Sequence, residues 1–149
     1  MTRIAPAVRV LSAVVLGLSA GAILAEGVLL VPWWRALPPQ AFLAWYAENA
    51  ERLVAFFGPL EGAAGVLALA AAVLPAGRRA PLVVAAVLAV AILVMFPLYF
   101  QGVNASFAAG TIPVDGVGAE LARWARWHWC RTVLAIVAAV AAVAGVRRA

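Results

Sequence analysis

Long apolar stretches, each close to 20 residues, dominate the pattern of this chain. They cover residues 10–31, 53–74, 81–99 and 127–146, and proline, glycine or arginine bounds each of them. A helix of about 20 apolar residues crosses roughly 30 Å of hydrocarbon. Because lipid offers the backbone no hydrogen bonds, a spanning segment must be a helix or part of a closed barrel. We predict an all-α integral membrane protein in which four transmembrane helices form a bundle, as a single domain over residues 1–149.

A shorter segment between the first two spans has a different pattern. Phe42, Trp45 and Tyr46 fall on one helical face, whereas Glu48 and Glu51 point away from it. Such a segment lies on the bundle or in the membrane interface. We therefore expect a short amphipathic helix in the first outer loop.

Composition excludes several classes of protein. With 67% hydrophobic and 11% charged residues, the chain lies outside the range of soluble domains. Cys130 is the lone cysteine, so an internal disulfide, a dithiol redox pair and a cysteine-based zinc cage are excluded. Gly17 with Gly21, and Gly58 with Gly62, have the spacing that allows close approach of membrane helices.

The net charge of +5 reflects membrane topology better than nucleic-acid binding, because every basic residue is arginine and none forms a long run. Six arginines near span ends fall on one side of the membrane: Arg3, Arg9, Arg78, Arg79, Arg147 and Arg148. The positive-inside rule places this side in the cytoplasm. We expect both termini in the cytoplasm, the long connections outside, and the cell inner membrane as the location.

Ionisable residues within the spans define the candidate site. An Asp or Arg at the centre of a membrane helix costs about 2.5–3.5 kcal/mol on insertion scales, so each one needs a partner or a purpose. Glu26, Glu61, His128 and Arg131 all fall in the outer halves of their spans. We predict that they converge in a pocket toward the outer leaflet and are its catalytic residues. The side chains expected to bind a substrate there are Asn49, Tyr99, Gln101, Asn104 and Trp124.

Plainer interpretations exist for the same residues. Arg131 could simply neutralise Glu26 or Glu61 in an ion pair that ties helices together. His128 could be an interfacial residue like the tryptophans on either side of it. A metal ion on Glu26, Glu61 and His128 is a further alternative, although no local spacing of metal ligands supports it. We otherwise expect no cofactor, since no dinucleotide, phosphate or haem motif occurs.

Several short motifs follow one another along almost the whole chain. They are Gly17 to Pro32 as a span closing in proline, Asn49 followed by Pro59, Asn104 after the third span, and Trp124-x-x-x-His128-x-x-Arg131. In order and spacing they resemble the anthrone-oxygenase-like family of small four-helix membrane proteins. The resemblance implies oxidation of a lipophilic phenolic polyketide of the anthrone type by molecular oxygen, without an organic cofactor.

The resemblance also implies roles for individual residues. His128 would be the general base, while Arg131 and Asn104 would stabilise the oxyanion that develops. Trp124 and Tyr99 would hold the flat ring. The expected partners are thus a lipophilic small molecule and the lipid bilayer, with no nucleic acid and with a second copy of the chain as a possible partner.

Glu26 and Glu61 have no counterpart in the family pattern. Buried carboxyl groups suit a cationic substrate, or an acid-catalysed cyclisation or rearrangement of a lipophilic metabolite. A non-catalytic protein that binds or moves a small molecule, or an accessory subunit, is the alternative from another class. A transporter would need polar residues in the inner halves of its spans, and we expect none there.

Overall fold

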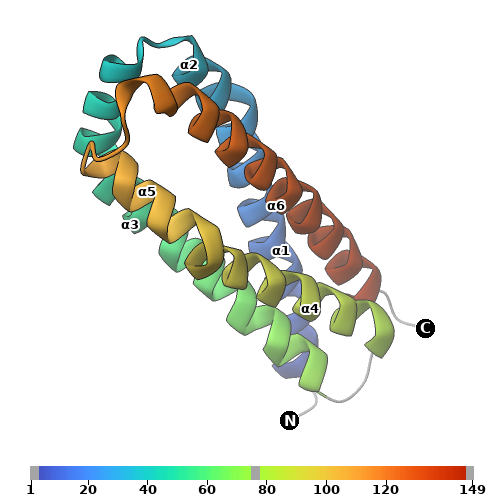
Figure 1. Ribbon diagram of the computed structural model, residues 1–149. Coiled ribbons are helices and arrows are strands. Elements are labelled where there is room, and N and C mark those ends of the chain that lie inside the picture. The colour runs from blue at the N-terminus through green and yellow to red at the C-terminus, as the bar shows by residue number, and fades with distance from the viewer. Residues whose placement is uncertain (1–3, 75–77, 147–149) are drawn as a thin grey trace.

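The computed structural model describes residues 4–74 and 78–146, which form an elongated bundle of helices (Figure 1). In chain order the elements are α1 (Ile4–Ala25), the π-helix η1 (Glu26–Leu30), α2 (Val31–Ala36), α3 (Pro39–Val73), α4 (Arg79–Met95), the π-helix η2 (Phe96–Phe100), α5 (Gln101–Ala108), the 3-10 helix η3 (Val114–Gly116) and α6 (Val117–Val146). No strand occurs in these two ranges. The prediction of an all-α four-helix bundle is confirmed.

Four continuous helical stretches are long and apolar enough to cross a membrane: 4–36, 39–73, 79–108 and 114–146. They extend beyond the predicted spans, because the flanking amphipathic residues continue the same helices. Large apolar side chains such as Leu18 and Val73 point outward, 60% and 75% exposed. An apolar exterior of this kind is suited to contact with lipid. The protein is an integral membrane protein.

The helices pack in a ring. α1 packs against α6 and α3, and α4 also packs against α6 and α3. The two described ends of the chain lie at one end of the bundle, whereas α2 lies at the opposite end (Figure 1). The arginines at 3, 147 and 148 and the connection at 75–77 lie outside the described residues.

Helix α3 differs from the expected short amphipathic helix followed by a separate span. It runs from Pro39 to Val73 without a break, so the amphipathic segment is its first part. Good helix formers such as Ala, Glu and Leu fill this segment, which explains the continuity. Pro59 lies in the interior of this helix, where it removes the hydrogen bond to the carbonyl of Ala55.

Two π-helical turns, which the sequence pattern did not predict, interrupt the first and third spans. η1 begins at Glu26, and η2 begins at Phe96. Pro32 follows η1 near the start of α2, and Pro97 lies inside η2. A proline lacks an N–H group and crowds the preceding turn, and a wider turn accommodates both effects. The two π-helices lie beside the cavity described below.

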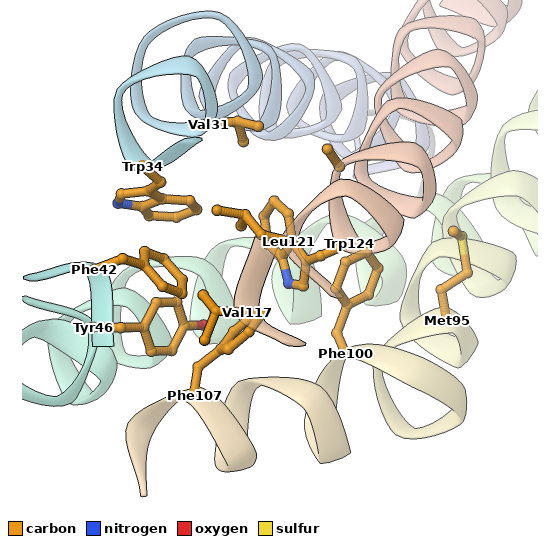
Figure 2. Packing of buried hydrophobic residues seen from close by; sticks show 11 residues of the cluster. Val31, Trp34, Phe42, Tyr46, Met95, Phe100, Phe107, Val117, Leu121 and Trp124 are labelled. Carbon is orange, nitrogen blue, oxygen red and sulfur yellow. The ribbon is translucent and has the colours of Figure 1, made fainter. Parts of the chain in front are cut away.

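The core differs between the two ends of the bundle. The end near α2 is aromatic, and Figure 2 shows rings of Trp34, Phe42, Tyr46 and Phe107 packed together. Their centroids lie 5.0–6.0 Å apart in mostly edge-to-face pairs, a favourable arrangement for aromatic rings. At the other end the core consists mainly of alanine, which lets the helix backbones approach closely.

The glycines at which the helices approach closely are not the four expected from their spacing. Nothing lies within 4 Å of a Cβ placed on any of those four, so they face open space. A Cβ on Gly27 would instead lie 2.9 Å from Nε2 of His128, and one on Gly65 would lie 2.5 Å from Leu93. The expectation was wrong because the spacing identifies a helix face without showing what that face contacts.

Candidate functional site

A cluster of charged side chains joins three helices in the half of the bundle near α2. Nη2 of Arg131 on α6 lies 3.0 Å from Oε2 of Glu26, the first residue of η1. Nη1 of the same guanidinium lies 3.4 Å from Oε1 of Glu61 on α3. All three side chains are buried. Arg131 is therefore a cation held between two carboxylates from different helices.

Aromatic rings hold the guanidinium in place from other directions. Its central carbon lies 4.7 Å from the ring centroid of Phe100 and 5.9 Å from that of Phe57. A desolvated cation over an aromatic face is stabilised by the negative charge of that face. Nε of Arg131 is buried without a hydrogen-bond partner among the described residues. The orientation of Arg131 is thus fixed by its terminal nitrogens and by the rings.

His128 is fully buried beside this cluster, and both of its ring nitrogens have partners. Nε2 lies 3.0 Å from the backbone carbonyl of Ile23, and Nδ1 lies 3.2 Å from Nη2 of Arg131. A carbonyl only accepts hydrogen bonds, so Nε2 carries the proton and Nδ1 accepts from the guanidinium. The geometry therefore fits a neutral imidazole that orients Arg131. The ring also stacks on Trp124 at 4.9 Å and 12°.

A cavity of about 690 Å³ lies between α3 and the α4–η2–α5 helix, with the charged cluster at its deep side. This volume is within the range of small-molecule sites. Its polar lining residues are Glu26, Tyr46, Glu51, Glu61, Gln101, Asn104, Trp124 and Arg131. His128 does not line the cavity, because the side chains of Trp124 and Arg131 lie between it and the cavity. Its ring stacks on Trp124 and contacts the guanidinium of Arg131. The predicted catalytic residues are thus together, but His128 stands behind the other three.

Among the residues expected to bind substrate, Gln101, Asn104 and Trp124 line the cavity. Nε1 of Trp124 donates to Oδ1 of Asn104 at 2.9 Å. This bond engages the oxygen of the Asn104 amide and leaves its two N–H donors for other partners. Asn104 is therefore oriented as a donor at the cavity wall.

Asn49 and Tyr99 do not line the cavity. The Tyr99 hydroxyl donates to Oε1 of Glu120 at 2.8 Å, and its ring stacks on Trp127 at 5.0 Å. Asn49 donates to the carbonyl of Trp45 at 2.8 Å, within the same helix. Both side chains thus have local structural contacts instead of facing the cavity.

Sequence reasoning missed Tyr46 and Glu51 as lining residues. The pattern places Glu51 on the outward face of a separate amphipathic helix. On the continuous helix α3, however, Glu51, Gly58 and Glu61 share one face, since they are spaced by seven and three residues. Helical periodicity carried through Pro59 would have placed Glu51 on the same side as Glu61.

The alternative of a metal on Glu26, Glu61 and His128 does not fit the geometry. Arg131 occupies the space between the two carboxylates, and its guanidinium also fills the contact with Nδ1 of His128. Within residues 4–74 and 78–146, no three His, Cys, Asp or Glu side chains form a group that could hold a metal ion. The two carboxylates are arranged around the guanidinium of Arg131 instead of a metal ion.

The inner half of the bundle contains buried polar side chains, contrary to expectation. Arg9, Ser12 and Ser19 lie on the buried face of α1, and Arg9 donates to the carbonyl of Leu74 at 3.4 Å. The hydropathy pattern hides the two serines because the spans are so apolar. Leu16 is buried on this face between them, so they form no continuous polar path.

Comparisons with known proteins complete the description of the site. No protein-family model matches the chain, and no curated protein or solved structure matches it.

Proposed function

We propose that the protein is a membrane-embedded enzyme that moves protons to and from a lipophilic small molecule held in the cavity. The observation that carries this proposal is the position of Glu61. The Glu61 side chain lines the cavity, and its Oε1 atom is held by Arg131 only through an ion pair at 3.4 Å, without a hydrogen bond. A carboxyl group in this position can exchange a proton with a bound molecule.

The charges of the cluster indicate which carboxylate exchanges the proton. Two ionised carboxylates, one guanidinium and a neutral imidazole would leave one negative charge buried in the membrane, which is costly. A single proton on the carboxylate pair removes it. Glu26 has the shorter contact with Arg131, 3.0 Å against 3.4 Å for Glu61. Glu26 therefore remains the ionised partner of Arg131, and the proton is exchanged at Glu61.

Other side chains stabilise negative charge on the substrate. Arg131 is fixed by Glu26, His128 and Phe100, so it needs no rearrangement when charge develops nearby. The N–H donors of Asn104 provide a second, neutral contact. Donors arranged in advance around a developing oxyanion in a dry site contribute a large part of catalysis.

Oxidation of an anthrone-type substrate is one reaction that uses this proton transfer. Glu61 first gives up the proton that it holds at rest, and its carboxylate then takes a proton from an activated methylene group. The resulting carbanion gives electrons to molecular oxygen. The methylene becomes a carbonyl and the second oxygen atom leaves as water. This proposal rests on the resemblance described above, but it assigns the base to Glu61, because His128 does not reach the cavity.

Cyclisation or rearrangement is the second candidate, and the carboxyl pair favours it. One protonated and one ionised carboxyl group can donate and accept protons in the same turnover. This reaction consumes no oxygen. The two candidates therefore share their first step and differ in the requirement for oxygen.

The test follows deuterium. Purified protein in lipid nanodiscs is incubated in D₂O with a lipid-soluble extract, or with a hydroxylated anthrone under argon, and the molecules are analysed by mass spectrometry. The proposal predicts deuterium in one lipophilic compound above the level in protein-free nanodiscs. Admission of air then distinguishes oxygen uptake with quinone formation from an oxygen-independent product. Saturable binding without deuterium or product would make the protein a non-catalytic binder.

The orientation in the membrane is part of the same proposal. Arg9 lies near the start of α1, and Arg78 and Arg79 lie at the start of α4. Both helices start at the end of the bundle that carries the two described chain ends (Figure 1). The positive-inside rule then puts this end in the cytoplasm and the cavity in the outer leaflet of the inner membrane. Reporter fusions at both termini that are active only in the periplasm would overturn this orientation.

A further inference from the structure

Negative charge exceeds positive charge around the cavity. Three carboxylates line it, those of Glu26, Glu51 and Glu61, whereas Arg131 is the one basic residue among its described lining residues. Arg131 is already engaged by the two deep carboxylates. Glu51 forms no ion pair with any residue in the described ranges. A bound cation would therefore offset the excess of negative charge around the cavity.

Aromatic side chains form much of the cavity wall. Tyr46, Phe57, Phe96 and Trp124 all line it, and they come from α3, η2 and α6. The faces of such rings attract cations, more strongly where water is excluded. Acidic groups at both the deep side and the mouth, with aromatic rings between them, suit a positively charged organic molecule better than an anion.

The cavity opens toward lipid. Helices α3 and α5 lie side by side (Figure 1), and the lining residues at their seam include the exposed Val54, Ala55 and Gly58 of α3 and Ala105 of α5. The three α3 residues belong to the apolar stretch 53–74, and Ala105 follows the apolar stretch 81–99 on the same continuous helix. A molecule dissolved in the bilayer reaches the cavity through this seam without crossing water.

We propose that the cavity binds a lipophilic cation, an organic molecule with an ammonium or other positive centre on an apolar body. Its positive centre docks at the carboxylate of Glu61 and releases the proton that the carboxylate pair holds. One positive charge enters the cluster as one leaves, so the buried charge stays balanced. The inference shares with the proposed function only the assignment of the exchangeable proton to Glu61.

Two ions of similar size and opposite charge test this. Tetraphenylphosphonium and tetraphenylborate are each titrated into the protein in nanodiscs of zwitterionic lipid, and protein-free nanodiscs correct for partition into lipid. Calorimetry measures binding, and a pH indicator in weakly buffered solution measures released protons. We expect saturable binding of the phosphonium with release of a proton for each ion bound, and no saturable binding of the borate. Equal binding of both ions, or binding without proton release, would overturn the inference.

Variants on one helix locate the effect. Glu61→Gln should abolish proton release and weaken phosphonium binding at least about 10-fold, which corresponds to about 1.4 kcal/mol. Glu48→Gln is the matched control, because Glu48 is exposed on α3 and does not line the cavity. Proton release that persists in Glu61→Gln contradicts the assignment.

A variant at the mouth serves if Glu61→Gln does not fold. Gly58→Phe adds a ring to the cavity wall and should reduce phosphonium binding, whereas Gly62→Phe, one turn away and outside the cavity lining, should not. Equal affinities in these two variants would contradict binding at the seam. If the protein exchanges deuterium into a neutral substrate but does not bind the phosphonium, cation binding is refuted and the proposed proton-transfer function still stands.

Discussion

Arg131 donates from Nη2 to Nδ1 of His128 across 3.2 Å, and the two residues lie three positions apart on α6. The opposite nitrogen of the imidazole contacts the carbonyl of Ile23 at 3.0 Å. The histidine thus connects the backbone of α1 to the guanidinium at the cavity. This relationship makes His128 a positioning residue for Arg131.

Replacement of His128 tests this role. His128→Phe removes both ring hydrogen bonds, and each buried group left without a partner costs about 1–3 kcal/mol. We expect lower stability and slower turnover because Arg131 loses one of its supports. The dependence of the remaining rate on pH should keep the shape seen in the wild type. If one limb of the pH profile disappears in this variant, His128 is the general base.

Gly27 controls how closely η1 approaches α6. A Cβ at this position would lie 2.9 Å from Nε2 and 3.1 Å from Cδ2 of His128. Overpacking of a dense core costs about 1–3 kcal/mol. Gly27→Ala should therefore lower the thermal unfolding temperature in detergent. Gly21→Ala is the control, since no atom would lie within 4 Å of the added methyl group, and equal effects of the two changes would refute the close approach.

The seam between α3 and α5 should control access of substrate. Gly58→Phe fills part of the cavity wall, and we expect KM to rise or turnover to disappear. Gly62→Phe adds the same ring to the same helix outside the cavity lining. It should leave turnover near the wild-type value. Similar kinetics for both variants would mean that substrate does not occupy this cavity.

Asn104 and Tyr99 were both expected to bind substrate, yet they have different environments. Asn104→Ala removes donors from the cavity wall and should slow turnover. Tyr99→Phe removes the hydrogen bond to Glu120, worth about 0.5–1.5 kcal/mol, and should reduce stability only slightly. Steady-state kinetics of the two variants, beside their unfolding temperatures, measure this difference. A loss of turnover in Tyr99→Phe with normal stability would instead indicate that Tyr99 contacts the substrate.

Much of the fold was predictable because lipid imposes a simple rule. Backbone groups must be satisfied within each span, so long apolar stretches become helices. The same physics brings Glu26, Glu61 and Arg131 together, since a charged group alone in hydrocarbon is too costly. These conclusions depend on residue type and position along the span.

Other features depend on packing and could not be predicted in this way. His128 points into the bundle because Nε2 contacts the Ile23 carbonyl and because Gly27, which has no side chain, leaves room for the imidazole ring. A hydropathy pattern shows neither feature. The π-helices at Glu26 and Phe96 change the helix register locally. They alter which residues face the cavity, and periodicity alone does not reveal them.

The central claim is that Glu61 exchanges a proton with the molecule in the cavity. The most direct measurement compares deuterium incorporation by the wild type, Glu61→Gln and Glu48→Gln in nanodiscs under argon. General acid–base groups contribute about 10²–10⁴-fold to rate. We predict a loss of about that size in Glu61→Gln and a wild-type rate in Glu48→Gln. A Glu61→Gln variant that folds and incorporates deuterium at the wild-type rate would contradict the account.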